Sequence, residues 1–447
     1  MHEAAASLGA ALPLWTVLPF VLLLLAIALL PLAAPHFWEH NRNRALIAAA
    51  CAAPVLLYLP GAHGAVGTEA LFEKGLEYAS FILLLTALYV ITGGIHVRGS
   101  LSGTPLVNTG MLALGAALAS VIGTTGASVL LVRPLLAANA PRERKTHIFV
   151  FFIFIVSNCG GLLTPLGDPP LFLGFLKGVP FEWTLRLWKE WLLVNGSLLA
   201  LFHVWDQVVL AREELQRPGA QLEEVQRHAP LGIDGAHNFA FLLGVVAVIY
   251  AAGRGLGHGG EPWPFGMQEL LMGALALLAY LSTAPAIRAR NHFSFAPIHE
   301  VAILFAGIFA TMAPALLILN AHARSFAIDE PWKFFWASGS LSSFLDNAPT
   351  YLTFAATACG LDGVPLEGRY LARFLAEGPR AAEILAAISC GSVFMGANTY
   401  IGNGPNFMVK AIAEARGVRM PSFFGYMAYS GAILIPLFAL ATLLFFR

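Results

Sequence analysis

Two carboxylates lie in apolar sequence, where a charged group is costly. Asp168 belongs to the segment "LLTPLGDPPLFLGF" (residues 162–175), and Asp346 belongs to "FLDNAP" (residues 344–349). A charged aspartate at the centre of a membrane span costs roughly 2.5–3.5 kcal/mol, and such residues commonly mark an ion or proton path. Both also have a structural interpretation, because aspartate often caps the helix that follows it. Capping and ion binding are compatible, so both interpretations stay open.

The residues around Asp168 predict that a helix is interrupted there. Pro165, Gly167, Pro169 and Pro170 fall within six residues, and prolines at this density remove backbone donors and clash with the preceding turn. A helix broken inside a membrane presents carbonyl groups at one end and amide groups at the other, and secondary transporters bind ions with such ends. We therefore predict that this backbone and Asp168 form part of an ion site.

Neutral oxygen donors gather at four predicted interruptions of the chain. Each such residue is individually more often a helix-packing hydrogen bonder, but their clustering favours binding of a hard cation such as Na⁺. We expect no cofactor and no catalytic residue, with Na⁺ and H⁺ as transported or coupling ions. The predicted binding residues are Thr124, Thr125, Ser128, Asn158, Thr164, Gly167, Asp168, Ser343, Asp346, Asn347, Thr350, Asn398, Thr399, Gly402, Asn403 and Asn406. The predicted sodium ligands are Thr125, Thr164, Asp168, Asp346, Asn347 and Asn403.

The composition predicts the elements that hold these residues. The chain has 447 residues, of which 57% are hydrophobic and 12% charged, and its mean hydropathy is +0.71. A soluble domain carries about twice this charged fraction, so the apolar excess must face lipid. We expect an all-α, multi-pass membrane protein in the plasma (inner) membrane of a bacterial cell. Zero net charge argues against a nucleic-acid partner, and no phosphate-binding loop indicates ATP-driven transport.

Apolar runs near the ~20 residues that cross a bilayer recur along the chain. Two further apolar stretches, about 105–138 and 331–360, contain polar residues near their centres, at "IGTTGASVLL" and "SSFLDNAPTYLTF". We predict that each is a re-entrant hairpin, which is tolerable only where protein or a water-filled cavity surrounds its tip. The predicted spans are 13–34, 45–60, 77–95, 148–176, 190–209, 237–252, 265–283, 297–320, 381–409 and 422–446.

The distribution of basic residues predicts the orientation. Lys and Arg accumulate in cytoplasmic loops, and the segment "APRERKTH" (residues 140–147) is basic, whereas the outer loop of the first half offers only Lys74. We therefore expect residues 140–147 inside, the N-terminus outside, and a first span that is retained rather than cleaved. The first hairpin then enters from the cytoplasm and the second from outside.

This arrangement predicts two inverted repeats, at 1–210 and 237–447, joined by a polar linker at 211–236. The segment "LTPLGDPPLF" (163–172) aligns without gaps with "NTYIGNGPNF" (398–407). The alignment pairs Thr164 with Thr399, Gly167 with Gly402, Asp168 with Asn403, and Pro170 with Pro405. The broken spans are therefore expected to be equivalent halves of one site.

The paired tips "GTTGAS" and "LDNAP" and the paired breaks "NCGGLLTPLGDPP" and "GANTYIGNGPN" resemble those of the ion transporter superfamily. The likeness is to its sodium/proton antiporter and citrate-transporter-like branches. The resemblance implies a homodimer, a scaffold and a mobile transport domain in each protomer, elevator-type alternating access, and Na⁺ held between each tip and its neighbouring break.

Three functions stay open at this point. Sodium-coupled carboxylate symporters of this superfamily carry Ser-Asn-Thr at both tips, and here the tips read Thr-Thr-Gly and Asp-Asn-Ala, so we favour cation/proton antiport. The alternative is a sodium- or proton-coupled citrate or carboxylate transporter, in which Arg133 binds the substrate unless it only reaches the cytoplasmic interface. The remote alternative is an intramembrane aspartyl protease, which the segments "PLGD" and "LD" do not match.

Overall fold

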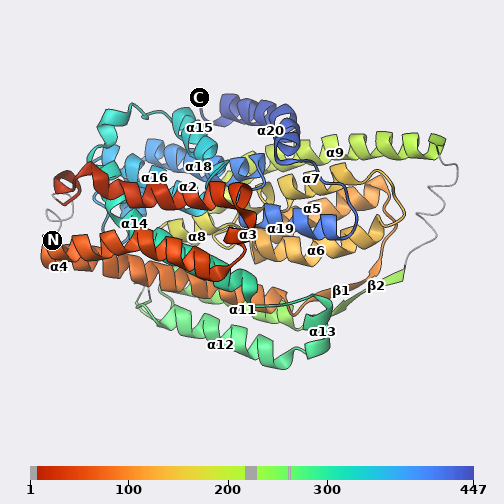
Figure 1. Ribbon diagram of the computed structural model, residues 1–447, viewed down its shortest axis with the longest axis horizontal. Helices are drawn as coiled ribbons and strands as arrows, with labels where there is room; N and C mark the ends of the chain where they lie inside the picture. Colours follow the sequence, from red (N-terminus) through yellow and green to blue (C-terminus); the bar gives the residue numbers. More distant parts are fainter. Residues whose placement is uncertain (1–7, 217–228, 260, 262) are drawn as a thin grey trace.

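The computed structural model describes residues 8–216, 229–259, 261 and 263–447. These residues form helices and one two-stranded sheet. Most helices run along the longest axis of the molecule (Figure 1). Seven helices among the described residues are long and apolar enough to cross a membrane. The chain is therefore a helical, multi-pass membrane protein, as the composition predicts.

The first three predicted spans form two structural units. The elements are η1 (Leu14–Val17), α2 (Leu18–Ala33), α3 (Pro35–Trp38) and α4 (Asn41–Thr92). Helix α4 contains one non-helical residue, Gly64 (φ 54°, ψ −129°), which separates two helical segments. The first segment contains the predicted span 45–60, and the second contains residues 77–92 of the predicted span 77–95. The connection between the two segments is a tight turn at Gly64 rather than a longer loop, and Lys74 lies within the second segment, where it forms an ion pair with Glu77 (2.9 Å).

Each predicted hairpin is a pair of helices joined by a short turn. The first pair is α5 (Pro105–Ile122) and α6 (Thr124–Ala138), and the second is α15 (Pro331–Ser342) and α16 (Asn347–Leu361). Helices α5 and α6 lie toward one end of the long axis, and α15 and α16 lie toward the other (Figure 1).

Both predicted interrupted spans are broken. The first consists of α7 (Thr146–Ile155), η2 (Cys159–Leu162) and α8 (Pro169–Leu176), and the second of α18 (Pro379–Met395), η5 (Gly396–Asn398) and α19 (Gly404–Ala415). The first break is wider than the proline-rich segment predicts, because α7 already ends before the polar and glycine-rich residues 157–161.

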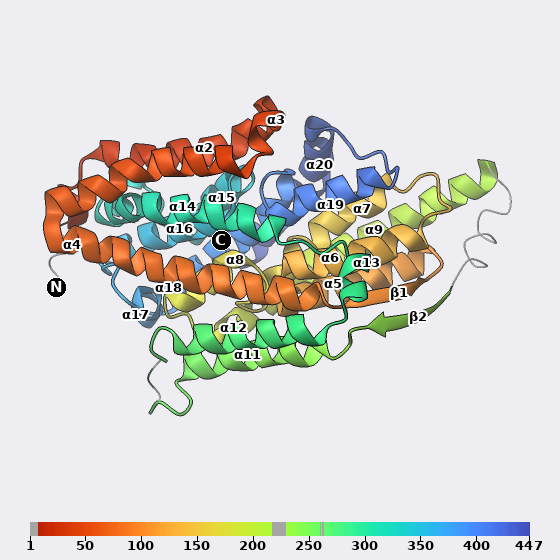
Figure 2. The same cartoon turned by 60° about the horizontal axis from the view of Figure 1, so that its bottom comes forward.

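The remaining helices lie around the two helix pairs and the two broken helices (Figure 1 and Figure 2). Helices α11 and α12 pack together along one side of the molecule (Figure 2), and α14 packs against both α4 and α16. The remaining helices are η3 (Phe181–Leu187), α9 (Trp188–Gln216), α11 (Asn238–Arg254), α12 (Met267–Ser282), α13 (Pro285–Arg290), α14 (Ala296–Ala321), η4 (Ala323–Phe326), α17 (Tyr370–Ala376) and α20 (Phe423–Phe445).

A small sheet lies at the C-terminal end of the predicted polar linker at 211–236. Strand β1 (His96–Ser100) pairs antiparallel with β2 (Ala229–Asp234), and His96 lies opposite Asp234. Helix α9 also continues to Gln216. The two ends of the expected linker are therefore regular structure, and residues 217–228 lie outside the described residues.

Buried aromatic residues and one ion-pair network hold α7, the first part of the first broken helix, in place. Every residue of α7 from His147 to Ile155 is buried, so this short helix lies in the interior. At its N-terminal end His147 contacts Asp206 of α9 (2.8 Å), and Arg142 forms an ion pair with the same carboxylate (2.6 Å). A buried pair of this kind fixes geometry, because removal of one partner leaves an uncompensated charge.

Candidate functional site

The tip of the first helix pair is a one-residue turn at Gly123. Its φ of +81° is a conformation that glycine adopts without strain. The turn places Thr124 at the start of α6, where its backbone N–H donates to the carbonyl of Gly167 (2.9 Å). The Thr124 hydroxyl donates to Oδ1 of Asp168 (2.9 Å). The first tip therefore contacts the first break directly, through backbone and side chain.

Asp168 lies in the residue before α8 and is 1% exposed. Its carboxylate accepts hydrogen bonds from the Nδ2 groups of Asn347 (2.6 Å) and Asn403 (3.3 Å), besides that from Thr124. It accepts none from the backbone of α8. Asp168 therefore does not cap its helix with its side chain, and the capping interpretation is wrong for this residue.

The second tip separates the roles of two neighbouring residues. Asp346 is half-buried, and its Oδ1 accepts from the backbone N–H of Ala348 (3.0 Å) at the start of α16. The capping interpretation is thus confirmed for Asp346. Asn347 is buried, donates to Asp168, and accepts through Oδ1 from the hydroxyl of Ser342 (2.7 Å). In this structure Asn347, rather than Asp346, joins the second tip to the buried carboxylate.

Asn403 is the counterpart of Asp168 at the second break. It precedes α19 with φ −149° and ψ 141°, close to the −144° and 145° of Asp168 before α8, and its side chain likewise leaves its own helix uncapped. Besides Asp168, it donates to the side-chain oxygen of Asn158 (3.2 Å), and Asn158 in turn donates to Asn406 (2.7 Å). A chain of side-chain amides thus joins the two breaks.

Two threonines fasten the breaks to the tips in the same way. Thr164 donates its hydroxyl to the carbonyl of Ser120 at the end of α5, and Thr399 donates to that of Ser343 beyond α15 (2.5 Å). Each hydroxyl also accepts from the N–H two residues later, at Leu166 (3.1 Å) and Ile401 (3.2 Å). The sequence alignment pairs Thr164 with Thr399, and the two side chains have matching contacts.

Close backbone packing explains the glycines of the two breaks. A Cβ atom added to Gly167 would lie 2.0 Å from the carbonyl oxygen of Gly161, and one added to Gly402 would lie 2.6 Å from that of Gly396. Real Cβ atoms do not approach backbone oxygen this closely. These positions therefore exclude a side chain by contact rather than by backbone conformation.

The electrostatics of the centre are unusual for a carboxylate. Asp168 is buried, and its hydrogen-bond donors are one hydroxyl and two amides, all neutral. Among the described residues no cationic side chain forms an ion pair with it. A buried charge normally requires a partner of opposite sign. The arrangement is suited to a cation or proton that reaches Asp168 from outside the protein.

The donor set also limits the kind of cation. In the part of the chain that the structure describes, no three His, Cys, Asp or Glu side chains form a metal-binding group. A cation at Asp168 would be held by one carboxylate with hydroxyl, amide and backbone oxygens, which suits Na⁺ and does not suit soft transition metals.

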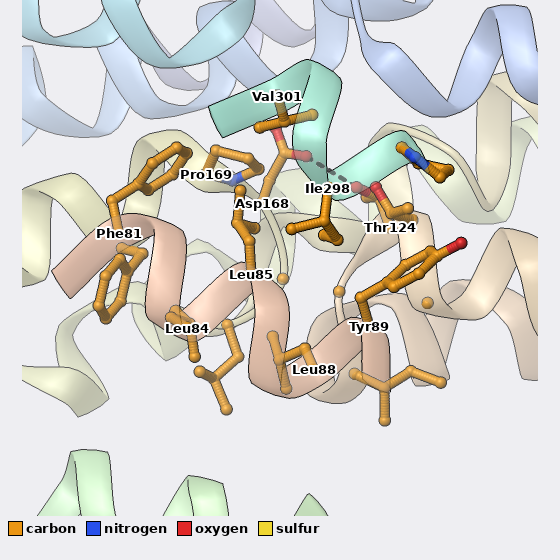
Figure 3. A pocket seen from close by; sticks show the side chains of 18 of the residues that line it. Phe81, Leu84, Leu85, Leu88, Tyr89, Thr124, Asp168, Pro169, Ile298 and Val301 are labelled. Carbon is orange, nitrogen blue, oxygen red and sulfur yellow. Dashed lines mark hydrogen bonds between the residues drawn. The ribbon is translucent and has the colours of Figure 1, made fainter. Parts of the chain in front are cut away.

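An apolar pocket of about 110 Å³ adjoins Asp168. Its walls come from α4, α14, the first tip and the first break. Figure 3 shows Asp168 and Thr124 bonded to each other on one side, with Leu84, Leu85 and Leu88 of α4 opposite. Thr125 is exposed and lines the same pocket. The buried carboxylate therefore borders a space between the broken helices and α4.

Fourteen of the sixteen predicted site residues fall into three groups, and the other two, Thr164 and Gly167, join the first break to the first tip. One connected network contains Thr124, Asn158, Asp168, Asn347, Asn403 and Asn406, with Ser128 attached through Ser157 (2.8 Å). A neighbouring group around the second tip contains Ser343, Asn398, Thr399 and Gly402. Outside the network, Thr350 donates to the carbonyl of Asp346 (3.0 Å). Among the described residues, Asp346 and Thr125 form no side-chain hydrogen bond with Asp168.

Sequence reasoning missed four serines of this centre. Ser120, near the first tip, donates to the carbonyl of Gly160 in the first break (2.6 Å). The hydroxyl oxygen of Ser342, near the second tip, lies 2.6 Å from the carbonyl of Ser392 near the end of α18, an acceptor that competes with Asn347 for its single proton. The carbonyl of Ser157 accepts from Asn403 (3.1 Å), and Ser392 contributes its carbonyl only. Ser120 and Ser342 each lie a few residues before a tip, and this shared position was the available signal.

The helical, multi-pass fold and the family comparison together define a membrane protein of the secondary-transporter class. The chain belongs to the family described as "Putative citrate transport", whose sequence model matches residues 9–446. This match confirms the resemblance to the citrate-transporter-like branch of the ion transporter superfamily, and it fits the carboxylate alternative better than cation/proton antiport. A search of the curated proteins found no match.

Proposed function

We propose that the protein transports citrate or a similar carboxylate across the membrane together with Na⁺ or protons, and that Asp168 binds the coupling cation. One observation carries the cation site: both tips and both breaks meet at this single buried carboxylate. Membership of the family supports the carboxylate as the substrate. Of the site residues predicted from the sequence, the three whose side chains bond to Asp168, namely Thr124, Asn347 and Asn403, belong to the proposed cation site.

The architecture that we propose is a pair of inverted repeats, each with a re-entrant helix pair and a broken helix. Three matches support it. The helix pairs lie toward opposite ends of the long axis (Figure 1), Asp168 and Asn403 share backbone conformation, and Thr164 and Thr399 share their contacts. Repeats of opposite orientation place their broken helices at one central site.

In the proposed mechanism the hydrogen-bond partners of Asp168 are neutral, so its negative charge stays uncompensated until a cation binds. A cation neutralises the buried carboxylate, and the loaded centre then crosses the membrane at a lower electrostatic cost than the empty one. Helices α4 and α14 pack closely together and line the pocket beside Asp168. We propose that they belong to the scaffold, against which the transport domain moves. By the family resemblance we also propose a homodimer with elevator-type movement, located in a bacterial plasma membrane.

Cation/proton antiport remains a second candidate because of one observation. The pocket beside Asp168 has no basic side chain in its lining, so a carboxylate substrate would find no opposite charge there. An antiporter needs only the carboxylate itself. The protease alternative receives no such support, since Asp346 caps α16 and the two aspartates share no hydrogen bond.

The experiment that separates these functions uses purified wild-type protein in proteoliposomes. Uptake of radiolabelled citrate is measured with an inward Na⁺ gradient, an inward proton gradient, or neither. Cation-induced proton flux is recorded in parallel without carboxylate. We expect gradient-dependent citrate uptake and no proton flux without citrate. Proton flux on addition of Na⁺ alone, without citrate uptake, would replace our proposal by antiport.

A further inference from the structure

A second cavity, separate from the pocket at Asp168, has five basic side chains in its lining. Its volume is about 460 Å³, and its walls come from β1, α6, the segment after α6, the end of α13 and the residue after α19. These elements lie toward the same end of the molecule (Figure 1). Its charged lining consists of Arg98, Arg133, Lys145, Arg290 and Arg416, and no Asp or Glu is in the lining.

The positive charge of this cavity is only partly compensated. Arg98 and Arg290 share the carboxylate of Asp234, at 3.4 Å and 3.0 Å. Lys145 donates to two backbone carbonyls. Arg133, half-buried, and Arg416, exposed, form no ion pair among the described residues, and the two guanidinium groups repel each other. Unpaired like charges that face one cavity favour a bound anion.

The simplest explanation for basic residues here is the accumulation of Lys and Arg in cytoplasmic loops. That rule explains why these basic residues lie on the cytoplasmic side of the membrane, but it does not explain why they line one cavity. Arg133 lies within α6, nine residues after Thr124, and not in a loop. Arg416 reaches the same cavity from a different part of the chain, after the second broken helix. Guanidinium groups from separate elements that face one space form a forked donor set suited to carboxylates.

The cavity also lies beside the site at Asp168. Thr124 and Arg133 stand on the same helix, about 14 Å apart along its axis at 1.5 Å per residue. Tyr89 of α4 lines the apolar pocket and lies near Arg133. The two spaces therefore follow one another along the contact between α4 and α6. The pocket at Asp168 has no basic side chain in its lining, whereas the second cavity has five.

We infer that this cavity binds a small polycarboxylate anion at the cytoplasmic mouth of the transport path, with Arg133 and Arg416 as its principal ligands. The inference rests on the proposed function for the choice of anion. A phosphate or the headgroup of an anionic lipid offers similar oxygen acceptors, and the test distinguishes these sources.

The test measures citrate binding to purified, lipid-depleted protein by isothermal titration calorimetry, with inorganic phosphate in a parallel titration. The variants are Arg133→Gln with Arg416→Gln, and the matched control Arg42→Gln, which removes one exposed charge of α4 outside the cavity. We expect the dissociation constant for citrate to rise at least about tenfold in the double variant, since a charged cleft concentrates counter-ions by 10-fold or more. The control should match the wild type, and phosphate should bind more weakly than citrate.

A second readout does not depend on how stable the double variant is. Ala137, which is exposed and lines the cavity one turn after Arg133, is changed to Cys, and its labelling rate by a charged thiol reagent is followed. We expect citrate to slow the labelling. Unchanged citrate affinity in the double variant, or labelling that citrate does not slow, would overturn the inference while leaving citrate transport intact.

Two further outcomes have distinct meanings. If anionic phospholipid co-purifies with the wild type and not with the double variant, while citrate affinity is unchanged, the cavity is a lipid site and the inference is wrong. If citrate binding depends on Arg133 and Arg416 but wild-type proteoliposomes take up no carboxylate, the binding site stands and the proposed function fails.

Discussion

Asp168 is a carboxylate that receives hydrogen bonds from three side chains and a positive charge from none of them. Hydrogen bonds to a charged group are each worth roughly 1.5–3 kcal/mol, which helps to offset the cost of burial without neutralising the charge. This is the condition expected of a group whose counter-ion comes and goes. A structural aspartate that is as fully buried as Asp168 normally has an ion-pair partner, as Asp206 has in Arg142 (2.6 Å).

The first prediction compares the two aspartates. Asp168→Asn removes the buried charge, so the rise in melting temperature that NaCl produces relative to choline chloride should disappear, because binding to the native state alone stabilises it. Asp346→Asn should keep that rise, since asparagine also caps helices and Asp346 caps α16. Differential scanning fluorimetry in detergent measures both. A full NaCl effect in Asp168→Asn would show that Na⁺ binds elsewhere.

The second prediction concerns the close approach at Gly167. In Gly167→Ala the new methyl group meets the backbone of Gly161 at 2.0 Å, so the break must shift, at a cost typical of overpacking, about 1–3 kcal/mol. Gly404→Ala is the matched control at the start of α19, where an added Cβ meets nothing within 4 Å. We expect a lower midpoint of thermal unfolding and lost transport only in Gly167→Ala. Equal behaviour of the two variants would contradict the observed packing.

At the scale of elements, most of the helical framework could be predicted from the sequence. The predicted hairpin at 105–138 is α5 and α6, and the predicted span 237–252 is α11 (Asn238–Arg254). Such segments are set by apolar length and by turn residues, which are local properties. The sheet of β1 and β2 was not predicted, because its strands are more than 120 residues apart in sequence and are stabilised by each other. Pairing at that distance leaves no local pattern.

The third prediction tests the equivalence of the two breaks. Thr164→Val and Thr399→Val each remove one hydroxyl that joins a break to a tip and accepts a backbone N–H. Each variant should lower the free energy of unfolding by about 1–3 kcal/mol, because buried partners are left unsatisfied. Thr353→Val is the control, since that hydroxyl bonds only within α16. Denaturant titration in micelles measures the effect, and a loss in one variant alone would argue against equivalent repeats.

At the scale of the whole molecule, the packing of the two halves shows which residue of the second tip contacts Asp168, a question that the sequence left open. Asp168 and Asp346 were equally plausible ion ligands on composition, and only the packing of the two halves shows that Asn347 reaches Asp168 while Asp346 caps its own helix. Whether Asp346 or Asn347 faces Asp168 depends on how α16 is oriented against the first half of the chain, and the sequence does not show this orientation. The residues at the two tips likewise did not decide whether the second transported species is a carboxylate or a proton.

The fourth prediction concerns orientation in the membrane. Single cysteines within 140–147 should react with an impermeant thiol reagent from the cytoplasmic face only, and those within 361–380 from the outer face only, because basic loops stay inside. Suitable exposed positions are Arg144 and Asp362, studied in a background without the four native cysteines. Labelling of both positions from the same face would overturn the topology and the opposite directions of the two helix pairs.

The most direct test of the central claim is gradient-driven uptake of radiolabelled citrate by proteoliposomes that contain either the wild type or Asp168→Asn. If Asp168 couples a cation to carboxylate transport, the wild type accumulates citrate above its external concentration under an inward Na⁺ or proton gradient. Asp168→Asn, confirmed as folded by gel filtration, accumulates none under either gradient. Accumulation by Asp168→Asn at the wild-type level would contradict the account, because the buried carboxylate would then have no part in coupling.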